Sequence, residues 1–294
     1  MKKALTMTVV ANMTSNYSEG LGNISSVQKV FKEQHVFAMR SRESLKNAIC
    51  VQAGLYDDLE TSVDGAAQKL VSEKVNAATC RALEGGYMST KDLTYIRNSS
   101  FYLTDAVACD SFINETRFHN NLYLASNNAK ANGVNLQDKD GAGKAGLMPY
   151  QYEYDKSMKL YSLTVDLEMV GKDENFNAEA DASEKADRVL ALLEAVRNLS
   201  LVVKGNLDNA EPLFIVGGMS NRKTHYFENV VRVKNGALSI TEDLKDKLSE
   251  DFQCALLRGD NFVNEDQIVK ELNPVSMKQF FDTLSGQVKS YYGI

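Results

Sequence analysis

The chain has 294 residues, of which 44% are hydrophobic and only 3 are proline, which excludes an intrinsically disordered chain and predicts a folded protein. No apolar run reaches about 18 residues, so no membrane-spanning helix and no membrane partner are expected. The net charge of −6 is uneven, because residues 1–46 carry +4 and residues 216–234 carry +3. Basic strips on an acidic body can still bind a polyanion locally, since salt screens charges beyond about 8 Å.

Two features of the sequence indicate a cytoplasmic protein. The start Met1-Lys2-Lys3 before an apolar stretch resembles a signal peptide, but Thr6 and Thr8 interrupt the stretch and favour a strand instead. The four cysteines are far apart in the sequence, so we expect reduced, mostly buried thiols. They are Cys50, Cys80, Cys109 and Cys254.

The first fifty residues predict a strand, a loop and a helix that starts between arginines. Apolar and polar side chains alternate over residues 4–14, the period of a half-buried strand. A loop with Asn16 and Asn23 follows, then a short strand and a helix over residues 41–55. Free N–H groups and the positive dipole end make such a helix start an anion site, and Arg40 and Arg42 can fork onto phosphate. The alternative is a pair of solvated arginines beside an ordinary Ser41 cap.

The middle of the chain is polar. We expect short helical pieces such as residues 64–84, and a long loop or mobile tip over residues 126–146. Gly141 to Gly146 match the spacing G-x-G-x-x-G, but such a motif needs a preceding strand and a following helix to bind a dinucleotide. Pro149 disfavours that helix, so a loop carrying Lys144 is the preferred interpretation, and a nucleotide-binding enzyme stays an alternative.

The second half alternates strands and helices. Residues 158–170 predict a strand with one polar face, and residues 182–199 predict a helix with Asp181 as its cap. Lys204-Gly205-Asn206 predicts the tip of a hairpin, where Lys204 and Asn206 can donate to phosphate or base, although a plain turn uses the same residues. Further strands are expected at residues 213–216 and 226–233, and further helices at residues 242–258 and 276–292.

The order of these elements predicts an α+β protein. A strand, a crossover helix and a returning strand recur in both halves, which is the split βαβ pattern of ferredoxin-like and RRM folds. The three histidines, His35, His119 and His225, have no sequence-local catalytic partners, and no zinc-binding spacing is present. We therefore expect no enzyme activity, no cofactor and no metal.

The run from Thr6 to Ile49 is similar to the N-terminus of the DevR-like CRISPR-associated family, the guide-RNA-binding backbone subunits of type I-B Cascade complexes. Gly141 to Tyr154 and VVKGN before PLFIVGG are similar to the family's Gly-rich segment and thumb. The resemblance implies an RRM-like palm (residues 1–55 and 147–240), an inserted finger region (56–146), a thumb hairpin (about 200–213) and a C-terminal helical part (241–294).

The resemblance also implies a function and a set of contacts. Subunits would stack head to tail along one guide RNA (crRNA), hold its backbone, present it for target DNA pairing and join other Cascade subunits in antiviral defence. The matched positions are Asn16, Asn23, Arg40, Ser41, Arg42, Lys144, Lys204 and Asn206, with Arg222 and Lys223 as candidate additional contributors. A protein–protein module that binds no RNA is the remaining alternative.

Overall fold

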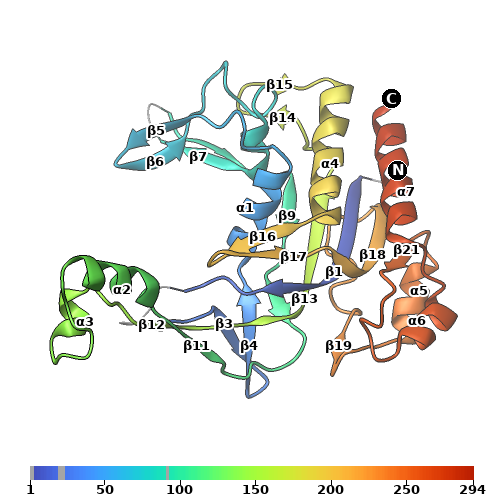
Figure 1. Ribbon diagram of the computed structural model, residues 1–294. Coiled ribbons are helices and arrows are strands. Elements are labelled where there is room, and N and C mark those ends of the chain that lie inside the picture. Colours follow the sequence, from blue (N-terminus) through green and yellow to red (C-terminus); the bar gives the residue numbers. More distant parts are fainter. Residues whose placement is uncertain (1–2, 19–23, 91–92) are drawn as a thin grey trace.

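The computed structural model describes residues 3–18, 24–90 and 93–294 and combines one large antiparallel sheet with seven α-helices in those residues (Figure 1). This arrangement confirms the α+β class. Along the sheet the strands run β21 (Gln253–Leu256), β18 (Pro212–Ser220), β1 (Ala4–Thr14), β13 (Lys156–Asp166), β10 (Ala106–Ala108), β4 (His35–Arg40) and β3 (Lys29–Lys32). β9 (Phe101–Leu103) also pairs with β13.

Strand β1 lies at the centre of this sheet and follows the predicted alternation. It pairs with β13 along its whole length, from Ala4 opposite Asp166 to Thr14 opposite Lys156, and with β18 on its other edge. Leu5, Met7 and Val9 point into one core, whereas Thr6 and Thr8 point to the opposite face and bond to hydroxyls of β13. The period of two therefore fixed which side chains each face of the sheet buries.

Three helices cover one face of the sheet: α1 (Arg42–Gln52), α4 (Ala182–Arg197) and α7 (Met277–Tyr292). Helices α4 and α7 lie side by side in Figure 1, and both bury their apolar stripes against β1, β13 and β18. The caps explain where these helices start, because Ser41, Asp181 and Ser276 each accept a bond from the backbone N–H three residues on.

The other face carries a second core built from C-terminal residues. Phe214 and Val10 of the sheet pack there with Phe227 and Phe252. The elements on this side are β19 (Val233–Lys234), β20 (Ala237–Leu238), α5 (Glu242–Leu248) and α6 (Glu265–Leu272). None of the helices in the described residues has the length and apolar character that crossing a bilayer requires.

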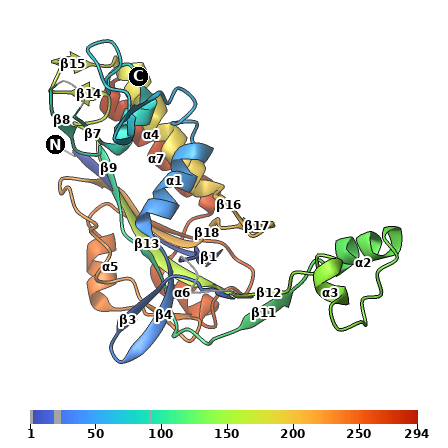
Figure 2. The same ribbon diagram turned by 90° about the vertical axis from the view of Figure 1, so that its left-hand side faces the viewer.

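Three parts project from the sheet (Figures 1 and 2). We call one of them the arm; it comprises β11 (Thr116–His119), α2 (Leu122–Ala131), α3 (Gly141–Lys144) and β12 (Tyr150–Glu153), and β2 (Ile24–Ser25) pairs with β12. The second is the hairpin of β16 (Ser200–Val203) and β17 (Asn206–Asn209). The third holds β5 (Thr61–Asp64), β6 (Ala66–Lys69), the 3₁₀ helix η1 (Arg81–Gly85), β7 (Tyr87–Ser89) and β8 (Tyr95–Arg97), beside β14 (Lys172–Asp173) and β15 (Ala178–Glu179).

Four predicted segments are wrong in detail. Residues 64–84 form a strand pair and a 3₁₀ helix, and residues 126–146 contain most of α2 and all of α3. α2 escaped prediction because its buried face consists of Ala125 and Ala129, which give almost no hydrophobic contrast.

The other two errors lie in the C-terminal third. Residues 226–233 are mostly turn, with Phe227 and Val231 buried four residues apart, and the predicted helix over residues 242–258 ends at Leu248. Asp251 takes a φ of 68°, which stops the helix, and the chain then adds β21 to the main sheet. The C-terminal part is therefore not purely helical.

Gly217 lies where two central strands approach closely. A Cβ at this position would stand 2.3 Å from the carbonyl oxygen of Thr6 and 2.8 Å from the Cα of Met7. We expect Gly217→Ala to lower the free energy of unfolding by about 1–3 kcal/mol, because β1 and β18 must separate. Urea denaturation measures the effect. The control is Gly286→Ala in α7, where a Cβ meets nothing within 4 Å and helix propensity should raise stability instead.

His225 gives the fold a dependence on pH. Its Nδ1 lies 2.9 Å from Thr164 Oγ1, and burial lowers its pKa against the opposing effect of Glu228. Below about pH 6.5 the unfolded chain therefore binds more protons than the folded chain, and stability falls as the pH drops. We expect His225→Gln to lose less unfolding free energy than the wild type between pH 7 and pH 5. Parallel profiles for both proteins would contradict this, and His35→Gln is the matched exchange at an exposed site.

Candidate nucleic-acid interface

The C-terminal end of β1 is tied to the base of the hairpin β16–β17. The backbone N–H of Thr14 donates to Asp208 Oδ2 at 2.8 Å, and Lys156 Nζ lies 3.2 Å from Asp208 Oδ1. Burial alone would raise the pKa of Asp208, but the bonds from Thr14 and Lys156 hold it below its usual value. The hairpin is thus anchored through a buried carboxylate.

A second buried charge holds the same strand end. Lys159 is fully buried, and its Nζ donates to Met13 O at 2.8 Å and to Asp155 Oδ2 at 2.6 Å. Ser15 Oγ donates to the same carboxylate oxygen at 2.7 Å. Burial lowers the pKa of Lys159 against the opposing charge of Asp155. This lysine therefore supports the strand and has no surface for a ligand.

Arg40 is also buried, at 4% exposure, and does not stand on the surface as the sequence implied. Its Nε donates to Thr14 O at 3.1 Å and its Nη1 to Ser44 Oγ at 2.8 Å. Its Nη2 and the neighbouring Thr14 Oγ1 have no hydrogen-bond partner among the described residues. An arginine keeps its charge when buried, so this unpaired nitrogen is a donor suited to an anion or a water.

The start of α1 is largely satisfied from within the chain. Asn16 Oδ1 accepts from the Ser41 N–H at 2.7 Å, and Asp105 Oδ1 accepts from the Arg42 N–H at 2.7 Å. Arg42 itself is exposed and pairs with Glu43 at 2.8 Å. Asp105 thus already occupies part of the anion site expected at this helix start, and the exposed Arg42 side chain remains as a surface cation.

The hairpin tip forms as predicted. Lys204 and Gly205 take φ values of 50° and 79°, the conformation of a two-residue type I′ turn. Lys204 Nζ lies 4.9 Å above the ring of Tyr17, which brings the tip to the loop that follows β1. The loop after β1 therefore contacts the start of α1 through Asn16 and the hairpin tip through Tyr17.

The remaining predicted residues lie elsewhere. Lys144 is exposed on α3, which lies with α2 in the projecting end of the arm (Figure 2). Arg222 and Lys223 follow β18 opposite the start of β1, so the length of β1, about 33 Å, separates them from the hairpin. Both are paired, Arg222 with Glu250 and Lys223 with Asp166 and Glu168. Asn23 lies outside the described residues.

A row of aromatic side chains and one arginine, which was not predicted from the sequence, begins at Tyr17. We call it the aromatic strip; it comprises Tyr17, Arg117, His119, Tyr150, Tyr152 and Tyr154. The ring of His119 lies 4.8 Å from that of Tyr152 and 5.6 Å from that of Tyr150, with interplanar angles of 26° and 21°. The sequence could have predicted part of this row, because tyrosines at positions 150, 152 and 154 alternate and so lie on one face of a strand.

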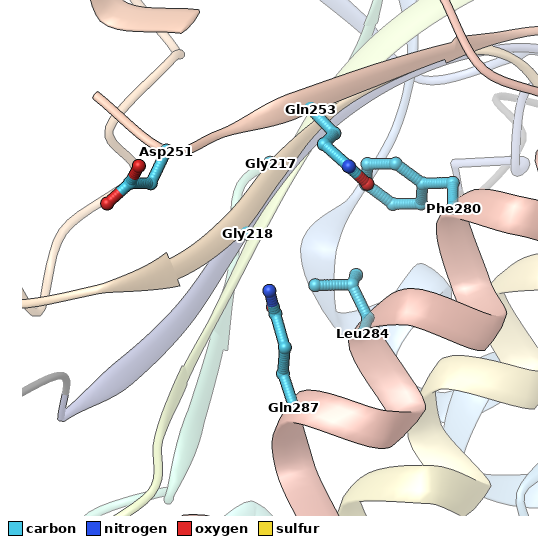
Figure 3. A pocket seen from close by; sticks show the side chains of 7 residues that line it. All are labelled: Gly217, Gly218, Asp251, Gln253, Phe280, Leu284 and Gln287. Atoms are coloured by element: carbon cyan, nitrogen blue, oxygen red, sulfur yellow. The ribbon is translucent and has the colours of Figure 1, made fainter. Parts of the chain in front are cut away.

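One pocket among the described residues is too small for a nucleotide. The pocket in Figure 3 has a volume of about 40 Å³, enough for one water molecule, and lies between β18, β21 and α7. Buried Gln287 Oε1, at its wall, has no partner among the described residues. A shallower hollow of about 330 Å³ lies between α1 and β9 and is lined by Arg42, Lys46 and Tyr102 among others.

The Gly141–Gly146 segment does not have the surroundings of a dinucleotide motif. Residues 135–149, all of them described, contain no strand before it, and α3 spans only Gly141–Lys144. A Cβ at Gly141 would meet Asn135 O at 2.0 Å, so this glycine is required for packing within the arm.

Two chains of solved structures share the fold of this chain. The chain is similar to a chain of a "CRISPR RNA-guided surveillance complex, pre-nicking", with a TM-score of 0.61 and 11% identity over 97% of this chain and 100% of that one. It is also similar to a chain of a "CRISPR RNA-guided surveillance complex", with a TM-score of 0.54 and 14% identity over 96% and 99% of the two chains. At these identities the likeness establishes the fold.

The family follows from the sequence itself. The family model DevR, described as "CRISPR-associated negative auto-regulator DevR/Csa2", matches residues 60–235. This is more than half of the chain, and the protein therefore belongs to the DevR/Csa2 family of CRISPR-associated proteins. No curated protein sequence matches the chain. The family to which the sequence is similar is thereby confirmed, although the matched range excludes the N-terminal run that first indicated it.

Proposed function

We propose that this protein binds the CRISPR guide RNA by its backbone, as a repeated subunit of a type I-B interference complex, and presents the guide for pairing with target DNA. The observation that carries the proposal is membership of the DevR/Csa2 family. Its partners are the guide RNA, target DNA through the guide, further copies of itself and other Cascade subunits. It acts in the cytoplasm and catalyses no reaction.

The sheet supports an RRM-like palm. Strands β18, β1, β13 and β10 are neighbours in that order, and α1 and α4 lie on one face, as a split βαβ arrangement requires. In this proposal the palm comprises residues 1–55 and 147–240, residues 56–146 are the finger region, and β16–β17 is the thumb. Strands β9 and β10 of the finger region complete the palm sheet. Residues 241–294 add β21 to the edge of the palm sheet, and α7 of the same segment covers one face of the sheet.

The surface that joins the thumb tip to the start of α1 suits an RNA backbone. Arg42, Lys204 and Asn206 are exposed there, and Asn16 and Ser41 bond to each other between them. Buried Arg40 has the unpaired Nη2 beneath this surface. Phosphate contacts of this kind position a strand without reading its sequence. Lys144 would reach the RNA from the arm, whereas the ion pairs of Arg222 and Lys223 leave less charge for it.

Exposed apolar side chains support contact between copies. Tyr123 and Leu124 of α2 are 79% and 67% exposed, and Val202 and Leu207 of the thumb are 75% and 73% exposed. These groups lie on different projections, so one copy can offer its arm while the next offers its thumb. Such a contact is heterologous and does not close, which gives a filament.

Co-expression with a CRISPR array and the sister subunits tests the proposal. The complex is purified, digested with nuclease, and the protected RNA is sequenced. We expect a regular ladder of guide-length fragments, because each stacked copy shields the same length of RNA. Protein that carries no RNA after this treatment would contradict the proposal and favour a protein–protein module.

A further inference from the structure

The aromatic strip has a geometry that the fold alone does not require. Three of its rings, His119, Tyr150 and Tyr152, lie within 26° of parallel, and the centroids of Tyr150 and Tyr152 are 6.4 Å apart. Tyr152 is buried beneath its neighbours, but Tyr150 is 45% exposed and His119 is exposed. The outer rings of this stack, His119 and Tyr150, are therefore accessible at the surface and are not part of a closed core.

The guanidinium group of Arg117 extends the row of stacked groups. The guanidinium carbon of Arg117 lies 3.4 Å from the ring centre of Tyr154, so the two planes are in contact. Nucleobases stack on arginine planes as well as on aromatic rings. Arg117 remains accessible, because its side chain is 41% exposed and its partner Glu115, 3.3 Å away, is 60% exposed.

Tyr17 connects the strip to the thumb. Its hydroxyl donates to Glu153 O at 2.8 Å and its ring meets Tyr152 edge-on at 6.1 Å, while Lys204 covers it from the other side. Burial, followed by the effects of Tyr152 and Tyr154, raises the pKa of Tyr17 to about 12, so the hydroxyl stays protonated and fixed. The aromatic strip and the cationic thumb tip thus meet at Tyr17, where aromatic rings and the positive charge of Lys204 are neighbours.

We propose that the aromatic strip is a stacking platform for unpaired nucleobases of a single strand, with His119 and Tyr150 as the surfaces that receive the first base. The inference rests on the proposed function and specifies which part of the RNA meets this part of the protein. Stacking platforms next to cationic grooves are typical of binding without sequence preference, because every base has a flat face. The strip would then hold bases, while Arg42 and Lys204 hold phosphates.

The test compares two RNA probes and two matched variants of the full chain. Fluorescence anisotropy measures binding of a short labelled oligouridine and of an equally long strand with abasic sites, over a range of potassium chloride concentrations. The double variant His119→Leu with Tyr150→Leu removes the open rings. Phe118→Leu is the control, since Phe118 is 61% exposed on the opposite face of the same strand. Tyr150→Phe keeps the ring, and circular dichroism checks folding.

We expect the double variant to bind oligouridine at least about fivefold more weakly, down to the level of the abasic strand, with the slope against salt unchanged. Phe118→Leu and Tyr150→Phe should bind like the wild type. Equal binding of both probes by the wild type, or equal losses in Phe118→Leu and the double variant, would overturn the platform and leave RNA binding intact. Binding of neither probe by the wild type would overturn both proposals.

Discussion

Glu84→Ala is expected to lower the free energy of unfolding by about 3–5 kcal/mol, the largest loss we predict for a single exchange. Glu84 is 1% exposed, with Oε1 at 2.7 Å from Arg188 Nη1 and Oε2 at 3.3 Å from Arg97 Nη2. Alanine would leave both buried guanidinium groups without this carboxylate, and the backbone N–H of Gly171 would lose its acceptor. Urea denaturation followed by circular dichroism measures the loss.

The comparison variants separate charge from size. Glu84→Gln keeps the shape and one acceptor, so a smaller loss is expected. Glu43→Ala removes a carboxylate that is 69% exposed and paired with Arg42 at the surface, where an ion pair contributes little. A loss for Glu84→Ala as small as that for Glu43→Ala would show that the buried network is not needed to hold the segment around η1 against α4.

Exchanging Arg42, Lys144 and Lys204 together for glutamine is expected to weaken RNA binding about 100-fold at 0.1 M salt. Each phosphate neutralised on a single strand contributes about 0.7 to the slope of affinity against salt, which is roughly fivefold per contact at this concentration. All three side chains are exposed, so the exchange should leave the fold intact. A salt titration of RNA affinity should also show a slope that is less steep by about 2.

The matched control makes the same change of charge on the other side of the molecule. Lys270, Lys278 and Lys289 are exposed on α6 and α7, and these helices lie on the right of Figure 1, away from the tip of the hairpin β16–β17. Their joint exchange for glutamine should change RNA affinity little. Equal losses in the two triple variants would mean that net charge, and not the positions of Arg42, Lys144 and Lys204, determines binding.

The elements with strong periodicity could be predicted from the sequence. Strand β1 was predicted over its observed range, and α4 was recognised by its cap at Asp181 and its buried stripe. These segments bury one face against a large core, so their pattern of apolar residues reflects their structure directly. The hairpin at Lys204-Gly205 could be predicted because its turn needs positive φ values.

The rest depended on contacts between residues far apart in the sequence. α2 packs through small alanines, and β21 is recruited to the sheet by β18, so neither has a local signature. Arg40 appeared as a surface cation but is buried by Thr14, Ser44 and the base of the hairpin. The aromatic strip joins Tyr17 to tyrosines more than a hundred positions later, which a reading along the chain cannot place together.

The central position of β1 has a consequence for how the protein is made. β1 is synthesised well before the two strands with which it pairs, residues 156–166 and 212–220. At a synthesis rate of about 5–20 residues per second, Leu5, Met7 and Val9 wait roughly 10–40 seconds for their second neighbour. Such distant pairing makes closure of the sheet a late and slow event. Until then β1 is an apolar strand with two unpaired edges, to which chaperones can bind.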